Sequence, residues 1–249
     1  DGESRRSKAD GVADAINRLL QNLVIKCAKS EGVRDYYSVA VLGYGSQVGP
    51  AFAGALAGHQ MVPISEIADQ PARIEERSKK VDDGAGGLVE QTVKFPIWFD
   101  AVAKGGTPMC AALTQAREIA AEWLSQHPDS FPPIVINITD GESTDGDPSA
   151  AAEALRDLSG ADGNVLLFNL HLSSQRGPAI EFPSSPEELP DRFAKLLFDI
   201  SSPLPEHMRA AAESEGYSTA PGARGFAFNA DMVAVIRFLD IGTRPSNLR

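Results

Sequence analysis

The chain has 249 residues, of which 43% are hydrophobic and 23% are charged, a composition typical of a globular protein. Its 34 acidic and 23 basic residues give a formal net charge of −11, which disfavours binding to the phosphate backbone of nucleic acids. The apolar runs have the length of β-strands, which excludes a membrane-spanning helix of about 18 or more residues. We therefore expect one domain over residues 1–249, in the cytoplasm, with neither nucleic acid nor membrane as a partner.

The two cysteines, Cys27 and Cys110, both stand inside apolar patterns of helical period. Their separation matches no zinc-binding spacing, so we expect two buried free thiols, as suits a reducing compartment.

The N-terminal part of the chain begins with an amphipathic pattern over Lys8–Lys29, which predicts a helix. Tyr37–Tyr44 is apolar and β-branched, as in a buried strand, and Ala51–Ile64 indicates a weaker strand paired with it. Residues 69–106 form the least regular stretch, which we interpret as an insertion in the single domain. Within it, Thr92–Phe99 contains a proline and is expected to be an edge or irregular strand.

The C-terminal part alternates helices and apolar strands. The expected elements are a helix at Met109–Leu124, a strand at Ile134–Ile138, a helix at Ser149–Leu158, a strand at Asn164–Leu170, a helix at Pro186–Ile200, a strand at Gly225–Asn229 and a helix at Asp231–Leu239. This alternation predicts an α/β fold with a doubly wound, mostly parallel central sheet flanked by helices.

Two polar residues stand where such a fold collects its ligands, beyond the carboxyl ends of the strands. Thr107 precedes the helix at Met109, and Asp140 follows the strand at Ile134. A hydroxyl and a carboxylate at this edge suit Mg²⁺, or another divalent cation such as Mn²⁺ or Ca²⁺. Glu142 and Asp145 follow closely and are candidates for a position around these ligands, although a turn residue is the preferred interpretation of Asp145.

Gly106-Thr107 before an apolar helix, followed by an apolar strand that ends in Thr139-Asp140-Gly141, resembles the von Willebrand factor type A (vWA) domain, in particular its intracellular bacterial members. The resemblance covers the element order over about residues 8–240. It implies a metal-ion-dependent adhesion site (MIDAS) at the top of the sheet, in which Thr107 and Asp140 match the ligands from the second and third loops.

The family's first ligand loop, Asp-x-Ser-x-Ser, is absent from this sequence. In the family that loop ends the first strand, which lies in the middle of the sheet. We therefore expect the displayed chain to lack that strand, and the strands near Tyr37 and Ile134 to have no direct hydrogen bonds between them. These two and the strand near Val165 should be buried and parallel.

The resemblance implies an adaptor or regulatory module rather than an enzyme. It would bind the acidic side chain of a protein partner through the metal, and the resemblance suggests a complex associated with a kinase or phosphatase as its setting. Two alternatives stay open: a vWA scaffold without metal, and a Mg²⁺-dependent phosphatase with Asp140 as its nucleophile.

Overall fold

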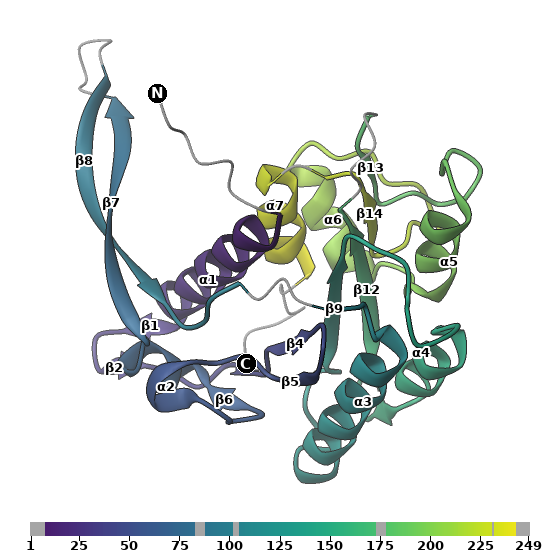
Figure 1. The fold of residues 1–249 in the computed structure, drawn as a ribbon, viewed down its shortest axis with the longest axis horizontal. Coiled ribbons are helices and arrows are strands. Elements are labelled where there is room, and N and C mark those ends of the chain that lie inside the picture. The colour runs from purple at the N-terminus through teal and green to yellow at the C-terminus, as the bar shows by residue number, and fades with distance from the viewer. Residues whose placement is uncertain (1–7, 83–87, 102–104, 173–177, 231, 243–249) are drawn as a thin grey trace.

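The computed structural model describes residues 8–82, 88–101, 105–172, 178–230 and 232–242 (Figure 1). The helices are α1 (Lys8–Cys27), the 3-10 helix η1 (Gly54–Leu56), α2 (Ile64–Asp69), α3 (Met109–Gln126), α4 (Ser149–Arg156), α5 (Arg192–Ile200), α6 (Glu206–Ser214) and α7 (Met232–Gly242). The strands are β1 (Ala28–Lys29), β2 (Gly32–Val33), β3 (Ser38–Val39), β4 (Leu42–Tyr44), β5 (Val48–Pro50), β6 (Val62–Pro63), β7 (Arg73–Asp82), β8 (Leu88–Ile97), β9 (Ile134–Thr139), β10 (Ser159–Gly160), β11 (Gly163–Asn164), β12 (Leu166–His171), β13 (Ile180–Glu181) and β14 (Phe226–Phe228).

The central sheet has the strand order β13-β14-β12-β9. Strands β9, β12 and β14 are parallel, and the edge strand β13 is antiparallel to β14. The β9–β12 register runs from Ile134 opposite Leu166 to Thr139 opposite His171. The predicted parallel pairing of the strands near Ile134 and Val165 is therefore confirmed, and it brings the carboxyl ends of both strands to one edge of the sheet.

Helices cover both faces of this sheet (Figure 1). Leu167 and Phe226 pack with buried residues of α3, α4 and α5 in one cluster. Phe168, Leu170 and Ala227 point to the opposite face, where residues of α1, α6 and α7 pack. Because neighbouring residues of a strand face opposite sides, a nearly continuous apolar strand serves both layers. The fold is thus mixed α/β, as the alternation of elements predicts.

The prediction of one buried parallel strand over Tyr37–Tyr44 is wrong. The segment forms β3, which pairs antiparallel with β6, and β4, which pairs antiparallel with β5, and its residues are mostly half-buried. The pairing of β3 with β6 agrees with the expected partner in Ala51–Ile64. A glycine-rich turn reverses the chain after β4. Strands β3 and β6 pack with α1 and α2 in a third cluster, whereas β4 and β5 contact α3.

The edge of β9 that faces away from β12 pairs with no strand in the described part of the chain. On the β12 side, the carbonyls of Pro133 and Thr139 accept the N–H groups of Leu166 and Leu172. Main-chain groups alternate along a strand, so those of Ile136 and its even-numbered neighbours point to the open edge. Among the described residues, no main-chain hydrogen bond joins β9 to β3 or β4.

Residues 69–106 are more regular than expected. Strands β7 and β8 pair along ten residues each, from Arg73 opposite Ile97 to Asp82 opposite Leu88, and form a ribbon that stands away from the rest of the molecule (Figure 1). The expected edge strand Thr92–Phe99 forms the second half of β8 as far as Ile97. Residues 83–87 and 102–104 of the predicted insertion lie outside the described residues.

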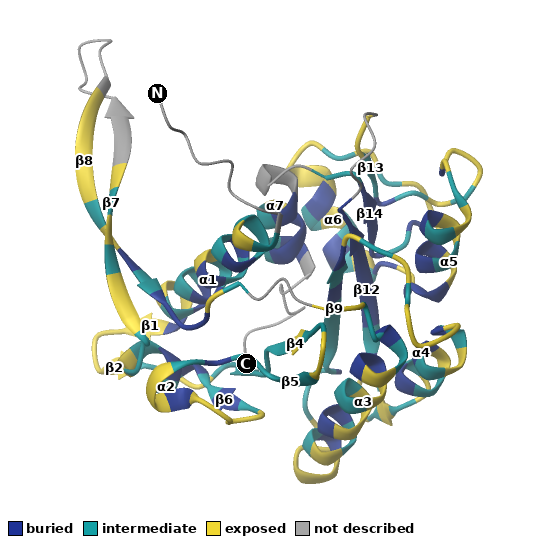
Figure 2. Cartoon of the chain, viewed as in Figure 1, coloured by how far each residue is buried: buried dark blue, intermediate teal, exposed yellow. Residues whose placement is uncertain are grey.

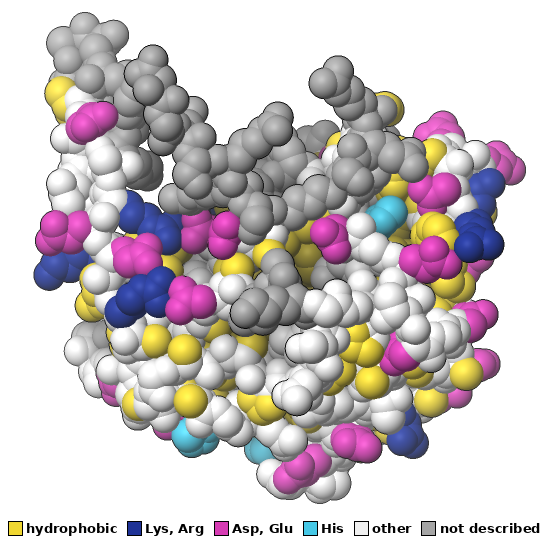
Figure 3. Space-filling model, in the orientation of Figure 1, with side chains coloured by type: hydrophobic (Ala, Val, Ile, Leu, Met, Phe, Trp, Pro, Cys, Tyr) yellow, Lys and Arg dark blue, Asp and Glu magenta, His cyan; other side chains and the backbone are white. Residues whose placement is uncertain are grey.

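Ion pairs hold the base of this ribbon, where Figure 3 shows acidic and basic side chains side by side. The Arg73 guanidinium donates to both carboxylate oxygens of Asp100, at 2.8 and 2.7 Å. The Arg77 guanidinium donates to Asp14 of α1 at 2.9 Å and lies 3.9 Å from the centre of the Phe95 ring. The contact with Asp14 joins β7 to α1, and the contact with Asp100 joins β7 to the segment that follows β8.

Other expectations need smaller corrections. Cys27 is buried as predicted, but Cys110 is only half-buried because it lies in the first turn of α3. Helix α5 begins six residues later than predicted, since the Asp191 carboxylate, rather than Pro186, caps it by accepting the N–H groups of Phe193 and Ala194. Helices α2 and α6 were not predicted.

Among the described residues, no helix combines the length and apolar character needed to cross a membrane.

The core face of α3 yields a stability prediction. Leu113 is 3% exposed and packs in the cluster between α3 and the sheet. Leu113→Ala should lower the free energy of unfolding by roughly 2–5 kcal/mol, because it removes buried methyl groups and leaves a cavity. Chemical denaturation measures this change, with the exposed Glu118→Ala on the same helix as the control. A loss below about 1 kcal/mol for Leu113→Ala would contradict this packing.

Candidate functional site

Three loops meet at the carboxyl end of β9. They are the β4–β5 turn, the segment before α3, and the β9–α4 loop. Gly105 has φ of +93°, and a Cβ on it would lie 2.4 Å from the main-chain nitrogen of Ser46. A Cβ on Gly106 would lie 2.6 Å from the Thr144 Oγ1. Side chains at these two glycines would collide with the neighbouring loops, so the close approach of all three loops requires glycine here.

Thr107 is fixed to the β9–α4 loop by a reciprocal pair of hydrogen bonds. Its N–H donates to Thr144 Oγ1 at 2.9 Å, and its carbonyl accepts the N–H of Thr144 at 2.9 Å. The Thr107 Oγ1 lies 3.3 Å from the position that a Cβ on Gly141 would occupy. The structure therefore brings the hydroxyl of Thr107 close to Gly141, the residue that follows Asp140.

Asp145 caps helix α3 from another loop. Its two carboxylate oxygens accept the N–H groups of Cys110 and Ala111, at 3.1 and 2.9 Å, and the Ser143 hydroxyl donates to it at 2.9 Å. The residue at the helix start, Pro108, provides no side-chain cap, so Asp145 supplies the missing acceptors. Partial burial opposes ionisation, but the N–H donors outweigh it and lower the pKa of Asp145.

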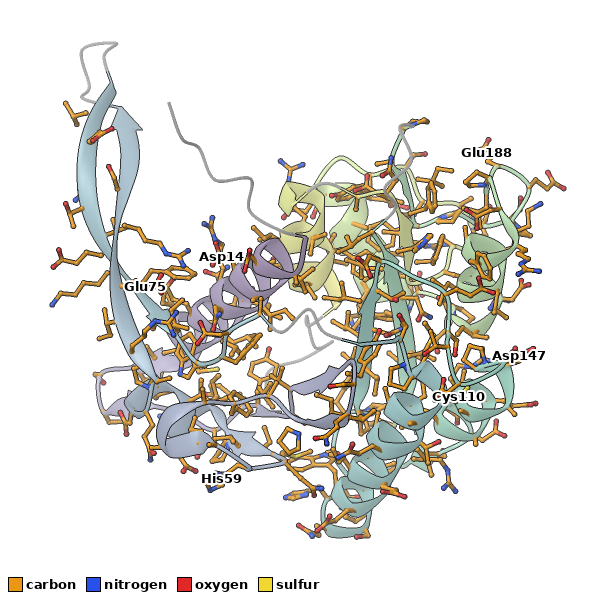
Figure 4. All side chains as sticks on the ribbon, viewed as in Figure 1. Asp14, His59, Glu75, Cys110, Asp147 and Glu188 are labelled. Carbon is orange, nitrogen blue, oxygen red and sulfur yellow. The ribbon has the colours of Figure 1, made fainter. Side chains whose placement is uncertain are left out.

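The carboxylates of the β9–α4 loop differ in what they bind. Arg192 of α5 donates to Glu142 at 3.1 Å, and the N–H of Ser149 donates to Asp147 at 2.9 Å. Asp145 caps α3. Among the described residues, only the carboxylate of Asp140 in this loop has no hydrogen bond or ion pair, and it is exposed. Figure 4 labels Asp147 of this loop and Cys110 at the start of α3.

Behind Asp140, a chain of buried polar side chains crosses the sheet. The Tyr44 hydroxyl donates to Asn137 Oδ1 at 2.5 Å, and the Asn137 amide donates to Asn169 Oδ1 at 2.8 Å. The Asn169 amide in turn donates to Ser201 Oγ at 2.9 Å. Burial raises the pKa of Tyr44 to about 12, and the negative charge of Asp140 acts in the same direction. Tyr44 is therefore a neutral donor that lies near the candidate site.

The donor set fits a hard divalent cation with few protein ligands. Thr107 offers a hydroxyl oxygen and Asp140 a carboxylate, while water would fill the remaining positions, as is usual for Mg²⁺. Within the described ranges, no group of three or more His, Cys, Asp or Glu side chains could hold a metal ion. Glu142 and Asp145, which were candidates for a place around the ligands, bind Arg192 and α3 instead.

Sequence reasoning missed the residues that assemble the site. Thr144 accepts a hydrogen bond from Thr107, which is 37 residues away in the sequence. Tyr44 donates a hydrogen bond to Asn137, which is 93 residues away. A lone threonine or tyrosine gives no local pattern from which such a contact follows. The close glycine pair before Thr107 was the one available signal, because adjacent glycines indicate close approach of another segment.

The cap on α3 should contribute to stability in a pH-dependent way. Asp145→Ala leaves two N–H groups without an acceptor and should lower the free energy of unfolding by about 1–2 kcal/mol at pH 7. Because the folded-state pKa lies below the ordinary value of 3.8, this contribution is complete above that value and disappears as the pH falls through the folded-state pKa.

Urea denaturation of both proteins between pH 7 and pH 3 measures this difference. Asp162→Ala, which removes an exposed carboxylate in the β10–β11 turn, serves as the control. A gap between Asp145→Ala and the parent protein that does not shrink at acidic pH would contradict the capping role.

In a comparison with known proteins, no family model, no curated protein and no solved structure matches the chain.

Proposed function

We propose that the chain is a protein-binding module that uses a divalent cation, with Thr107 and Asp140 as its metal ligands. One observation carries the proposal. The hydroxyl of Thr107 lies against the Asp140–Gly141 turn, and in the described structure neither that hydroxyl nor the Asp140 carboxylate has a hydrogen-bond partner. The three other carboxylates of the same loop are all engaged. The oxygen atoms of these two side chains are thus available to a ligand.

The surrounding contacts support a preformed site. The Thr107–Thr144 hydrogen bonds and the Asp145 cap hold both donor-bearing loops on the ends of α3 and β9, so binding would order few additional groups. Mg²⁺ bound there would offer an open coordination position to a carboxylate of the partner. A cation is also needed on electrostatic grounds, because a chain with a net charge of −11 otherwise repels an acidic partner.

This function is the one that the resemblance to vWA domains implies, and we extend the proposal to a doubly wound sheet of that type. The chain itself supplies two ligands, since its sequence contains no Asp-x-Ser-x-Ser loop. Recognition through a metal needs no nucleophile or general base, so we propose an adaptor or regulatory role rather than catalysis. A kinase- or phosphatase-associated complex is one setting for such a role.

Metal titration of the full chain tests the site. Mn²⁺ binding followed by electron paramagnetic resonance, with Mg²⁺ as the competitor, should give an affinity that Asp140→Ala lowers by about tenfold or more, because a charged ligand is lost. Thr107→Ala should have a smaller effect, since a neutral hydroxyl holds a dication less strongly. Glu142→Gln is the matched control and should change little, because Glu142 is paired with Arg192.

Two results would overturn the proposal in different directions. Equal Mn²⁺ affinity in the parent chain, Asp140→Ala and Glu142→Gln would show that Asp140 is not a metal ligand. The alternative of a scaffold without this metal site would then be favoured. Mg²⁺-dependent turnover of a chromogenic phosphate ester that Asp140→Asn abolishes would instead assign the phosphatase activity.

A further inference from the structure

Alternate residues of β8 direct their main-chain N–H and C=O groups either towards β7 or to the outer edge of the ribbon. The position of Pro96 shows which residues do which. Ile74 lies opposite Pro96, which has no N–H, so this pair cannot be one that exchanges two hydrogen bonds. The odd-numbered residues of β8 therefore bond to β7. The main-chain N–H and C=O groups of Glu90, Thr92 and Lys94 point away from β7, to an edge that no strand of the described chain pairs.

This edge is exposed over most of its length, as Figure 2 shows for β8. The side chains of Glu90, Thr92 and Lys94 are all exposed, and Val89 is 47% exposed. Towards its end the strand contacts α1, and there Phe95 and Ile97 are buried. A long exposed edge with free main-chain groups is a template for another strand.

We propose that a second copy of this chain pairs with this edge, β8 against β8 in antiparallel orientation, about a two-fold axis at Thr92. This register places Glu90 directly opposite the partner's Lys94, and by symmetry Lys94 opposite the partner's Glu90. The paired main-chain groups are those of the even-numbered residues, which are the ones that point outward. Two copies thereby form a four-stranded antiparallel sheet with one isologous interface.

The charge pattern selects this register over its neighbours. Sliding the strands by four residues would put Glu90 opposite the partner's Glu90 or Lys94 opposite the partner's Lys94, and like charges in facing positions are destabilising. Sliding by two residues would leave both charges opposite uncharged positions, such as Thr92. Only the two-fold at Thr92 pairs both charges with opposite charges.

Strand β7 extends the same pattern. In the observed ribbon, Glu76 lies opposite Lys94, Lys80 opposite Glu90, and Ser78 opposite Thr92. Across the four strands of the dimer, the row through Glu90 would therefore alternate Lys80, Glu90, the partner's Lys94 and the partner's Glu76. The central row would contain only hydroxyl residues. In these three rows, facing positions thus carry opposite charges or hydroxyl groups, which favours self-pairing of this edge.

Sedimentation velocity over a series of concentrations tests the dimer. The full chain should shift from 26.5 kDa towards twice that mass as its concentration rises. Glu90→Lys alone and Lys94→Glu alone should each raise the dimer dissociation constant by about tenfold or more, because each makes both symmetry-related pairs repulsive. The double variant should restore the dimer, and a mixture of the two single variants should form a heterodimer.

A second variant separates edge pairing from ribbon folding. Thr92→Pro removes an N–H that points outward, at the same parity as the natural Pro96, so the ribbon should persist while the dimer is lost. A chain that stays at 26.5 kDa at every concentration would overturn the proposal. So would a dimer that both single charge reversals and Thr92→Pro leave unchanged. Neither result bears on the metal site, because the ribbon contains none of its residues.

Discussion

Parallel pairing of β9 with β12 is the constraint on which the candidate site depends. The carboxyl ends of parallel strands lie at the same edge of the sheet, so the loop after each of these strands starts at that edge. Asp140 directly follows β9 there. The loop after β9 then binds the first turn of α3 through Asp145 and the preceding Thr107 through Thr144. Helix α3 is thus held at its first turn as well as along its packed face, which fixes Thr107 at the rim of the sheet.

The central elements could be predicted because their patterns leave few alternatives. Strand β9 is a short apolar run between polar segments, and α3 has one apolar face of helical period. Tyr37–Tyr44 carries the same kind of apolar run, and composition alone does not distinguish a buried parallel strand from a short hairpin. Strand β7 was missed because it is mostly charged, and a ribbon that stands in solvent needs little apolar alternation.

At the site, sequence position indicated Thr107 and Asp140, since one opens a helix and the other ends a strand. The roles of their neighbours depend on contacts across the fold, which local patterns do not encode. Glu142 is drawn to Arg192, and Asp145 to the N–H groups of α3. Likewise, the buried hydrogen bond between Asn137 and Asn169 fixes the stagger of β9 against β12, because a slip would leave two amides unsatisfied in the core.

The strand order of the sheet also determines how fast the molecule can assemble. Ile134 and Leu166 pair across 166 − 134 = 32 positions, and Asn169 and Phe226 across 226 − 169 = 57. Such distant contacts close long loops before they gain stability, which slows formation of the sheet. The β7–β8 ribbon joins neighbouring segments, and pairing of that kind is generally faster. If the ribbon pairs before the central sheet is complete, the charges at its facing positions would restrict the strands that its edge accepts from an early stage of folding.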